Sequence, residues 1–147
     1  GQLPAGGVYV APFRADSLYA ERPLVYSDAA NPRQLRQYHY HLWLYAPAQT
    51  VHDHLTASFG KMLSHNEADA GMRLEGRVLR LDRVRAGKAG TAAVALELRL
   101  MKGERVVHAG VYTAEQAAAD DSVSAHVVAV EQALASIYAD FLREVGR

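Results

Sequence analysis

The chain contains no cysteine, which excludes disulfide bonds, thiolate metal sites and cysteine nucleophiles. It also has no excess of charge of either sign, because 16 lysine and arginine residues balance 16 aspartate and glutamate residues. Binding of nucleic acid or of an anionic membrane surface through bulk electrostatics depends on such an excess. We therefore expect that nucleic acid is not a partner.

Long hydrophobic runs are absent as well. No apolar stretch approaches the roughly 20 residues that a membrane-spanning helix requires, and Gly1-Gln2-Leu3-Pro4 lacks the basic and then hydrophobic order of a signal peptide. Half of the residues are hydrophobic and 22% are charged, as in ordinary globular proteins, and a length of 147 residues fits one domain. These features predict a single soluble domain that spans residues 1–147.

Catalytic and phosphate-binding motifs are also missing. The chain has neither a Gly-x-Ser-x-Gly turn nor a Gly-x-x-x-x-Gly-Lys-Ser/Thr loop. The glycine-containing segment 87–91 lies between two expected strands, which favours a hairpin tip over a phosphate loop. The sequence thus predicts no enzymatic activity and no cofactor.

The seven histidines include two close pairs. His39 and His41 would share one face of a strand, where two imidazoles can hold a metal ion, but no third ligand stands at a recognisable spacing. The competing interpretation, which we favour, is that both rings pack beside Trp43 on a half-covered sheet. His52 and His54 are separated by about 200° around a helix, so they cannot bind one ion and are expected on the surface.

The first half of the chain shows three strand patterns and then a helix. Strands are expected at 8–13, with Pro12 marking an edge or a bulge, at 24–26, and at 35–45, where aromatic and aliphatic residues occupy both faces. Pro47 then suits the first turn of a helix. Apolar residues follow at helical spacing: Val51, Leu55, Phe59 and Met62.

The second half shows a long strand, a hairpin and a closing helix. The strand 73–85 alternates, but its apolar phase slips between Val78 and Leu79, which predicts either a β-bulge or a switch in the covered face. Strands 92–100 and 105–112 are expected to form a hairpin around Lys102-Gly103. After a connection at 115–121 and a cap at Asp121 or Ser122, an apolar stripe predicts a helix to residue 145: Val123, Val127, Val130, Leu134, Ile137, Phe141 and Val145.

This order of elements predicts an α/β fold in which a mixed β-sheet is flanked by two main helices, as three layers or as a sandwich. The strand-helix-strand step around Pro47 calls for a right-handed crossover.

A series of arginines in the long strand is a further candidate site: Arg73, Arg77, Arg80, Arg83 and Arg85. One interpretation is a dedicated site for an acidic group. Glu75 and Asp82 stand among these arginines, and they favour the alternative of a solvated strand with compensated charges.

The run Tyr38–Ala48 (YHYHLWLYAPA), which leads into the first predicted helix, resembles the central signature of the ABC-type transport auxiliary lipoprotein (DUF330-like) family. In that family an aromatic strand ends in Trp, and a short loop with Pro opens an amphipathic helix. The segment Leu74–Val78 (LEGRV), the alternating hairpin and the closing helix with Phe141 agree with the family in order and spacing. One departure is Leu42, where family members often carry Arg.

The resemblance implies an α/β sandwich like the anticodon-binding or TolB N-terminal domains, without catalytic residues. It implies a periplasmic domain anchored to the outer membrane by an N-terminal lipid on a cysteine just after a signal peptide, upstream of this chain. The partners it implies are an ABC transporter and MCE-type substrate-binding subunits that move lipids between membranes, and self-assembly into a homo-oligomer is a further expectation.

Two functional hypotheses follow. The first is a non-catalytic auxiliary component that acts through protein contacts, with an interaction surface formed by Tyr38, Tyr40, Trp43 and Tyr45. Core packing of these four aromatic residues is the competing interpretation. The second hypothesis is a small-ligand or lipid-binding domain with an apolar pocket between the sheet and the helices, near Trp43 and Tyr45.

Overall fold

One mixed sheet organises the part of the chain that the computed structural model describes, which is residues 7–15, 24–28, 31–38, 47–86 and 89–145. Its strands follow the order β4-β3-β5-β6-β7, with β1 and β2 also paired to β5. The elements are β1 Val8–Val10, β2 Arg14–Ala15, β3 Leu24–Asp28, β4 Asn31–Tyr38, α1 Pro47–Phe59, β5 Met72–Ala86, β6 Ala89–Lys102, β7 Arg105–Ala117 and α2 Val123–Val145.

The strand β5 is the centre of this sheet. Three short strands lie one after another along one of its edges, all parallel to it: β1 pairs with residues 72–74, β2 with 77–78 and β3 with 82–85. The other edge of β5 pairs antiparallel with β6, which pairs antiparallel with β7. The break between β1 and β2 falls at Ala11–Phe13, so the irregularity predicted at Pro12 is confirmed.

The bulge predicted in β5 is also confirmed, and it explains which side chains reach the core. Val78 pairs with Leu96 and Arg80 pairs with Ala95, which leaves Leu79 as an extra residue. Before the bulge the buried residues of β5 have even numbers, and after it they have odd numbers, as Leu81 shows. A regular strand would have turned Leu81 to solvent.

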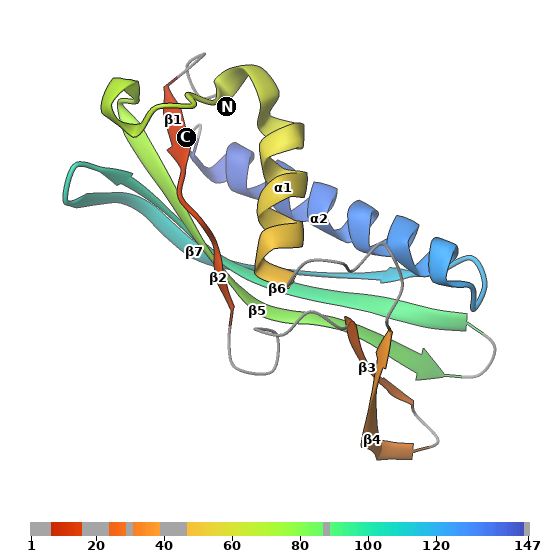
Figure 1. Cartoon of the computed structure of the whole chain (residues 1–147). Coiled ribbons are helices and arrows are strands. Elements are labelled where there is room, and N and C mark those ends of the chain that lie inside the picture. The colour runs from red at the N-terminus through yellow and green to blue at the C-terminus, as the bar shows by residue number, and fades with distance from the viewer. Residues whose placement is uncertain (1–6, 16–23, 29–30, 39–46, 87–88, 146–147) are drawn as a thin grey trace.

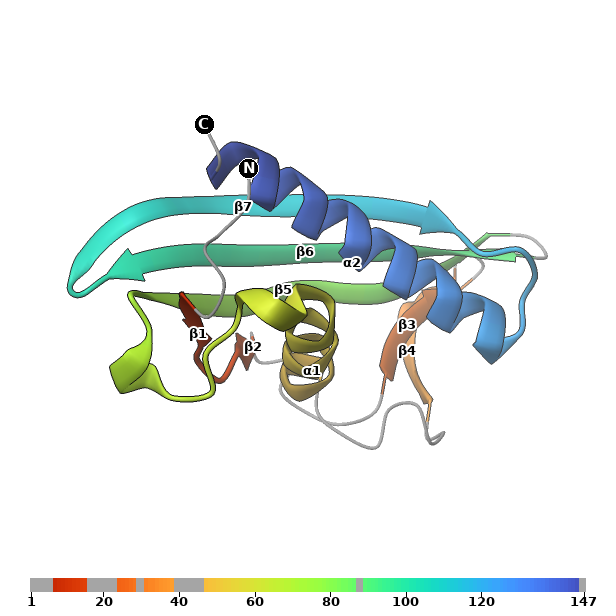
Figure 2. The same ribbon diagram turned by 90° about the horizontal axis from the view of Figure 1, so that it is seen from above.

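Both helices lie on the same face of the sheet, as Figures 1 and 2 show. The predicted class, a mixed sheet with two main helices, is confirmed, and the described elements form two layers rather than three. The helix α1 packs on β5, and α2 packs on β6 and β7. The core lies between the layers, where Leu55, Leu98 and Phe141 are 0% exposed. On the opposite face of the sheet, none of the described segments forms a helix; we call this the uncovered face.

The ends of the helices follow the expected local chemistry. Ser122 caps α2, since its Oγ accepts a hydrogen bond of 3.0 Å from the Ala125 backbone N–H. Asp120 Oδ1 in turn accepts a bond of 2.8 Å from the Ser122 backbone N–H. After α1, Gly60 adopts a positive φ of 45°, which favours glycine and ends the α-helix.

A fully buried arginine ties the start of α2 to the sheet. Arg83 of β5 is 0% exposed, and its guanidinium donates a bond of 2.7 Å to the Asp121 carbonyl. Gly90 of β6 makes room for it, because a Cβ there would lie 2.7 Å from Arg83 Nε. His126 in the first turns of α2 is likewise 0% exposed. Two polar side chains therefore occupy one end of the core.

Some predicted boundaries differ from the structure. The strand β7 runs to Ala117, so it includes part of the connection predicted at 115–121. The strand predicted at 35–45 is found as β4 up to Tyr38, and its remainder lies outside the described residues. Neither helix in the described ranges has the length and apolar character needed to span a bilayer.

Candidate functional site

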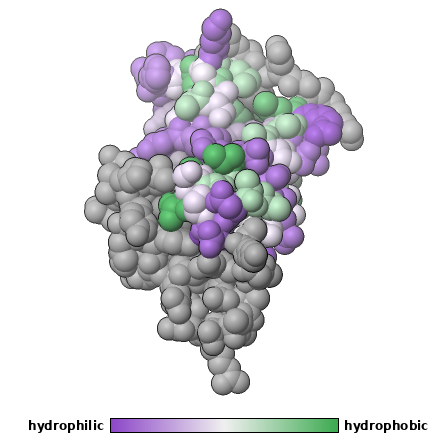
Figure 3. Space-filling model, turned by 90° about the vertical axis from the view of Figure 1, so that its right-hand side faces the viewer, coloured by the Kyte–Doolittle hydropathy of each residue, from purple (hydrophilic) through white to green (hydrophobic). Residues whose placement is uncertain are grey.

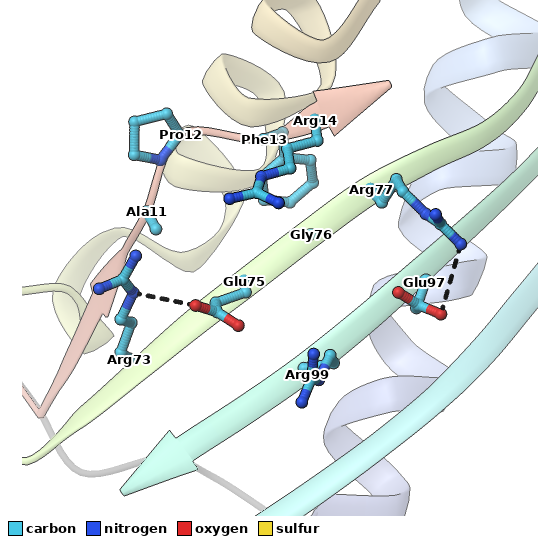
Figure 4. Close-up of a pocket in the computed structure, with 10 residues that line it drawn as sticks. All are labelled: Ala11, Pro12, Phe13, Arg14, Arg73, Glu75, Gly76, Arg77, Glu97 and Arg99. Atoms are coloured by element: carbon cyan, nitrogen blue, oxygen red, sulfur yellow. Dashed lines mark ion pairs between the residues drawn. The ribbon is translucent and has the colours of Figure 1, made fainter. Parts of the chain in front are cut away.

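The uncovered face of the sheet contains a charged hollow of about 660 Å³, which we call the arginine hollow (Figure 4). It lies where the segment between β1 and β2 passes beside β5, and it extends across to β6. Its lining residues are Ala11, Pro12, Phe13, Arg14, Arg73, Glu75, Gly76, Arg77, Glu97 and Arg99. Four of these ten residues are arginine, so this is the strongest candidate site for a charged ligand.

Strand alternation places the charged side chains on this face. Leu74 and Val78 point to the helices and are 0% exposed, so the alternating Arg73, Glu75 and Arg77 point away from them. Antiparallel pairing sets Glu75 opposite Arg99 and Arg77 opposite Glu97, which brings the two strands' charges to the same face.

The segment Ala11–Phe13 forms one wall of the arginine hollow. The Ala11 backbone N–H donates a bond of 2.9 Å to the Leu74 carbonyl, and pairing resumes where Arg14 stands beside Arg77. Between these points the ring of Phe13 covers Gly76, where a Cβ would meet ring carbons at 2.3 to 2.6 Å. The close packing of this ring on a glycine fixes the wall and positions Arg14.

Two of the four arginines are engaged by carboxylates. Arg73 lies 2.9 Å from Glu67 and 3.3 Å from Glu75, and Arg77 lies 3.7 Å from Glu97. Arg73 and Arg77 have side chains that are 44% and 45% exposed, so these pairs contribute little to stability. Their effect is to neutralise the two glutamates that line the hollow.

Arg14 and Arg99 have no ion pair with any residue that the structure describes. Arg14 comes from β2 and Arg99 from β6, on opposite sides of β5. A guanidinium presents a planar fork of N–H donors that fits a carboxylate or a phosphate. The arginine hollow can therefore bind an anion. The lining residues that the structure describes include no serine, cysteine or histidine.

A second polar cluster joins β7 to the last turns of α2. The Tyr112 hydroxyl donates a bond of 2.5 Å to the Glu144 carboxylate, and His108 Nε2 lies 2.7 Å from the same hydroxyl. Burial and this carboxylate raise the pKa of Tyr112 well above its usual value. The phenol therefore stays a hydrogen-bond donor, and the cluster holds α2 on the sheet.

The histidines of α1 differ from expectation, because neither is a free surface residue. His52 Nε2 lies 3.4 Å from the Val10 carbonyl, and its ring meets Phe13 edge-on at 5.7 Å. His54 Nδ1 lies 3.1 Å from the Tyr138 hydroxyl, and burial lowers the pKa of His54. They point to different partners, as their helical spacing required.

The predicted aromatic surface and the predicted histidine pair of residues 38–45 fall on side chains that the structure does not describe. Tyr38 is the last residue of β4, and its side chain is not among those described. The remaining aromatic and histidine candidates lie outside the described residues: His39, Tyr40, His41, Trp43 and Tyr45. In the described ranges, no group of three or more histidine, aspartate or glutamate side chains is arranged to hold a metal ion.

The predicted arginine series separates into different roles. Arg73 and Arg77 enter the arginine hollow, whereas Arg80 lies 2.7 Å from Asp82 and Arg83 is buried. Sequence reasoning missed Arg99, which the pairing of β5 with β6 places opposite Glu75. It also missed Arg14, for which no local signal exists, because the site depends on β2 docking against β5.

Several solved structures have a fold similar to that of this chain. A crystal structure of a Xanthomonas campestris protein of the family DUF330 superposes with a TM-score of 0.74 and 20% sequence identity, over 95% of this chain and 83% of that chain. The chain has the fold of this DUF330 protein. The structure of a hypothetical protein from Chlamydia trachomatis is also similar to this chain, with a TM-score of 0.60 and 11% identity, over 97% of this chain and 98% of that chain.

A crystal structure of an uncharacterized protein is also similar, with a TM-score of 0.70 and 17% identity, over 99% of this chain and 96% of that chain. No family model matches the sequence, and no curated protein matches it. At sequence identities of 20% or less, these similarities show the fold of the chain and say nothing of the role of the arginine hollow.

Proposed function

We propose that this chain is the folded domain of an envelope lipoprotein that serves as a non-catalytic auxiliary component of an ABC/MCE-type lipid-transport system. Two observations support the proposal. The chain has the DUF330 fold over nearly its whole length. Its segment Tyr38–Ala48 also resembles the signature of the auxiliary lipoproteins in the order of its aromatic residues and proline.

The uncovered face of the sheet is the feature that best supports a role in protein contacts. The hydrophobic core that stabilises the fold lies on the other face, which the two helices cover (Figure 2). The uncovered face presents charged side chains on β5 and β6, and on β7 it presents Val111, which stands opposite Glu97 and is 60% exposed. A broad face with charged residues beside exposed apolar ones suits a protein partner.

The partners in this proposal are the ABC transporter and the MCE-type substrate-binding subunits. A lipid on a segment that precedes this chain would anchor the domain to the outer membrane on the periplasmic side. Other copies of the chain would assemble with it into a homo-oligomer. In the side view of Figure 3, hydrophilic and hydrophobic residues alternate in small groups over the described surface, which suits contacts of mixed polarity.

The alternative function, lipid binding between the sheet and the helices, has less support. Side chains fill that space where the structure describes it: Phe59 and Phe141 stack with ring centres 6.5 Å apart, and Leu98 beneath the helices is 0% exposed. A bound lipid would have to displace these packed groups. Native mass spectrometry of the gently purified protein tests this alternative, which requires a co-purifying lipid.

Site-specific crosslinking tests the main proposal. A photoreactive residue is placed at Val111, 60% exposed on the uncovered face, or at Val128, 51% exposed on α2, in the full-length lipidated protein in its own envelope. We expect transporter or substrate-binding subunits to crosslink at Val111 and not at Val128. Crosslinks to them from Val128 alone would contradict the choice of face, and none from either position would contradict the proposed function.

A further inference from the structure

We propose that the arginine hollow binds a phosphate group through Arg14 and Arg99. This inference concerns a ligand site, and it does not depend on the transport role. It starts from the two guanidinium groups that have no ion pair with any described residue and that approach the same hollow from β2 and β6 (Figure 4).

The charge of the lining favours a phosphate over a single carboxylate. Among the described lining residues, four arginines and two glutamates give a formal charge of +2. Glu67, which is outside the lining, also takes up part of the Arg73 charge. One carboxylate needs one guanidinium fork, whereas a phosphate monoester carries about −1.5 to −2 near neutral pH and offers three oxygens. Two guanidiniums without an ion pair in the described part of the chain therefore match a phosphate in charge and in number of donors.

The glutamates do not prevent anion binding, because each is held by an arginine. Glu75 lies 3.3 Å from Arg73, and Glu97 lies 3.7 Å from Arg77. Glu75 stands directly opposite Arg99 in the sheet, and yet its carboxylate makes its ion pair with Arg73. This arrangement leaves the Arg99 guanidinium available to a ligand.

The hollow is also formed by well-packed backbone. Phe13 packs on Gly76, and the Ala11 backbone N–H bonds to the Leu74 carbonyl, so the wall that carries Arg14 is fixed at both ends. A volume of about 660 Å³ accommodates a phosphate together with an attached organic group. The side chains around it are partly exposed to solvent, so binding should weaken steeply as salt rises.

The phosphate could be supplied by a soluble compound or by a lipid headgroup, and both present the same chemistry. Isothermal titration of the whole chain with inorganic phosphate and with inorganic pyrophosphate measures the first source. Flotation with vesicles of phosphatidylcholine containing phosphatidic acid measures the second, with vesicles of phosphatidylcholine alone for comparison. The proposal expects binding to at least one of the phosphate probes, and binding to none of them would overturn it.

Matched variants locate the site. We expect Arg99→Ala and Arg14→Ala each to weaken binding about tenfold. Arg99→Lys, which keeps the charge but loses the planar fork, should fall between Arg99→Ala and the unmodified chain. Arg105→Ala removes the same charge from an exposed position outside the lining and should leave binding unchanged.

Three further results would overturn the proposal. An equal loss in Arg105→Ala would show that binding follows total charge rather than the arginine hollow. Unchanged binding in the Arg14 and Arg99 variants would show that the phosphate binds elsewhere. An acidic peptide without phosphate that binds more tightly than every phosphate probe would assign the hollow to a protein partner. Melting curves and circular dichroism verify that each variant is folded, and Arg99→Lys serves if an alanine variant is not.

Discussion

His126 should make the protein lose stability as the pH falls from 7.5 to 4. Its side chain is 0% exposed, and burial, together with the nearby Arg83 charge, lowers the pKa of His126 from 6.5 to about 4. In the unfolded chain this imidazole takes up a proton near pH 6.5, whereas in the folded protein it stays neutral down to about pH 4. Between these values the unfolded state binds more protons, so stability decreases as pH decreases.

The size of the effect follows from the difference between the two pKa values. A pKa difference of one unit corresponds to 1.36 kcal/mol, so the lowered pKa of His126 predicts a loss of roughly 3 kcal/mol by pH 4. That is a large part of the ~5–15 kcal/mol that stabilises a typical domain. Hydrogen bonds from Ser122 lower the pKa of the Asp120 carboxyl, so the stability that depends on its ionised form is lost mainly at pH values below those at which His126 acts.

Urea unfolding at a series of pH values measures this contribution. His126→Gln removes the titrating group, so its free energy of unfolding should fall by roughly 3 kcal/mol less than that of the unmodified chain between pH 7.5 and 4. His65→Gln, at an exposed position, should follow the unmodified chain. If His126→Gln and the unmodified chain had parallel pH profiles, the reasoning from burial would be refuted.

Three further predictions concern two packing contacts and one hydrogen bond, and all are measured by urea unfolding at neutral pH. Gly76→Ala should lower the free energy of unfolding by about 1–3 kcal/mol, because the added methyl group would collide with the Phe13 ring. Most of this loss should disappear when Phe13 is also replaced by Leu, and equal losses with and without Phe13→Leu would contradict the clash. Phe141→Ala should lower the free energy of unfolding by about 3–5 kcal/mol, because this ring is fully buried. Val128→Ala should lower it by less than about 0.5 kcal/mol, because Val128 is 51% exposed, and similar losses in the two variants would mean that α2 does not pack as described. Tyr112→Phe should cost about 1 kcal/mol by removing the hydroxyl that bonds to the α2 carboxylate, and an unchanged midpoint would contradict that bond.

Local chemistry made much of the fold predictable. The cap at Ser122 and the helix start at Pro47 follow from the residues at those positions, and both agree with the structure. The slip in alternation at Val78 and Leu79 identified the bulge, because the side chains that must reach the core are visible in the sequence. These features depend on neighbouring residues alone.

The polar part of the core was not predictable, because it depends on contacts between elements. The apolar stripe predicted Val127 as buried, yet the structure buries His126 and leaves Val127 half-buried. Tyr138, outside the predicted stripe, is buried because His54 and Phe59 of α1 contact it. Periodicity along one helix carries no information about which neighbour will lie beside it.

The candidate site shows the same division. Arg73 and Arg77 could be identified from strand alternation. Arg14 reaches the arginine hollow only because β2 pairs with the edge of β5, where Arg14 stands beside Arg77, a residue 63 positions later in the sequence. The predicted aromatic surface from Tyr38 to Tyr45 remains a prediction, since its side chains are not among those described.

The position of β5 in the chain has a consequence for biosynthesis. β1, β2 and β3 all precede β5, and the edge to which they bind does not exist until the ribosome has made residues 72–86. During translation β1 and β2 therefore emerge before the strand to which they bind, and β3 can pair only with β4 until β5 has been made. In the cell, the newly made N-terminal half depends on the completion of the later half, and a chain truncated before Met72 should be a substrate for quality-control proteases.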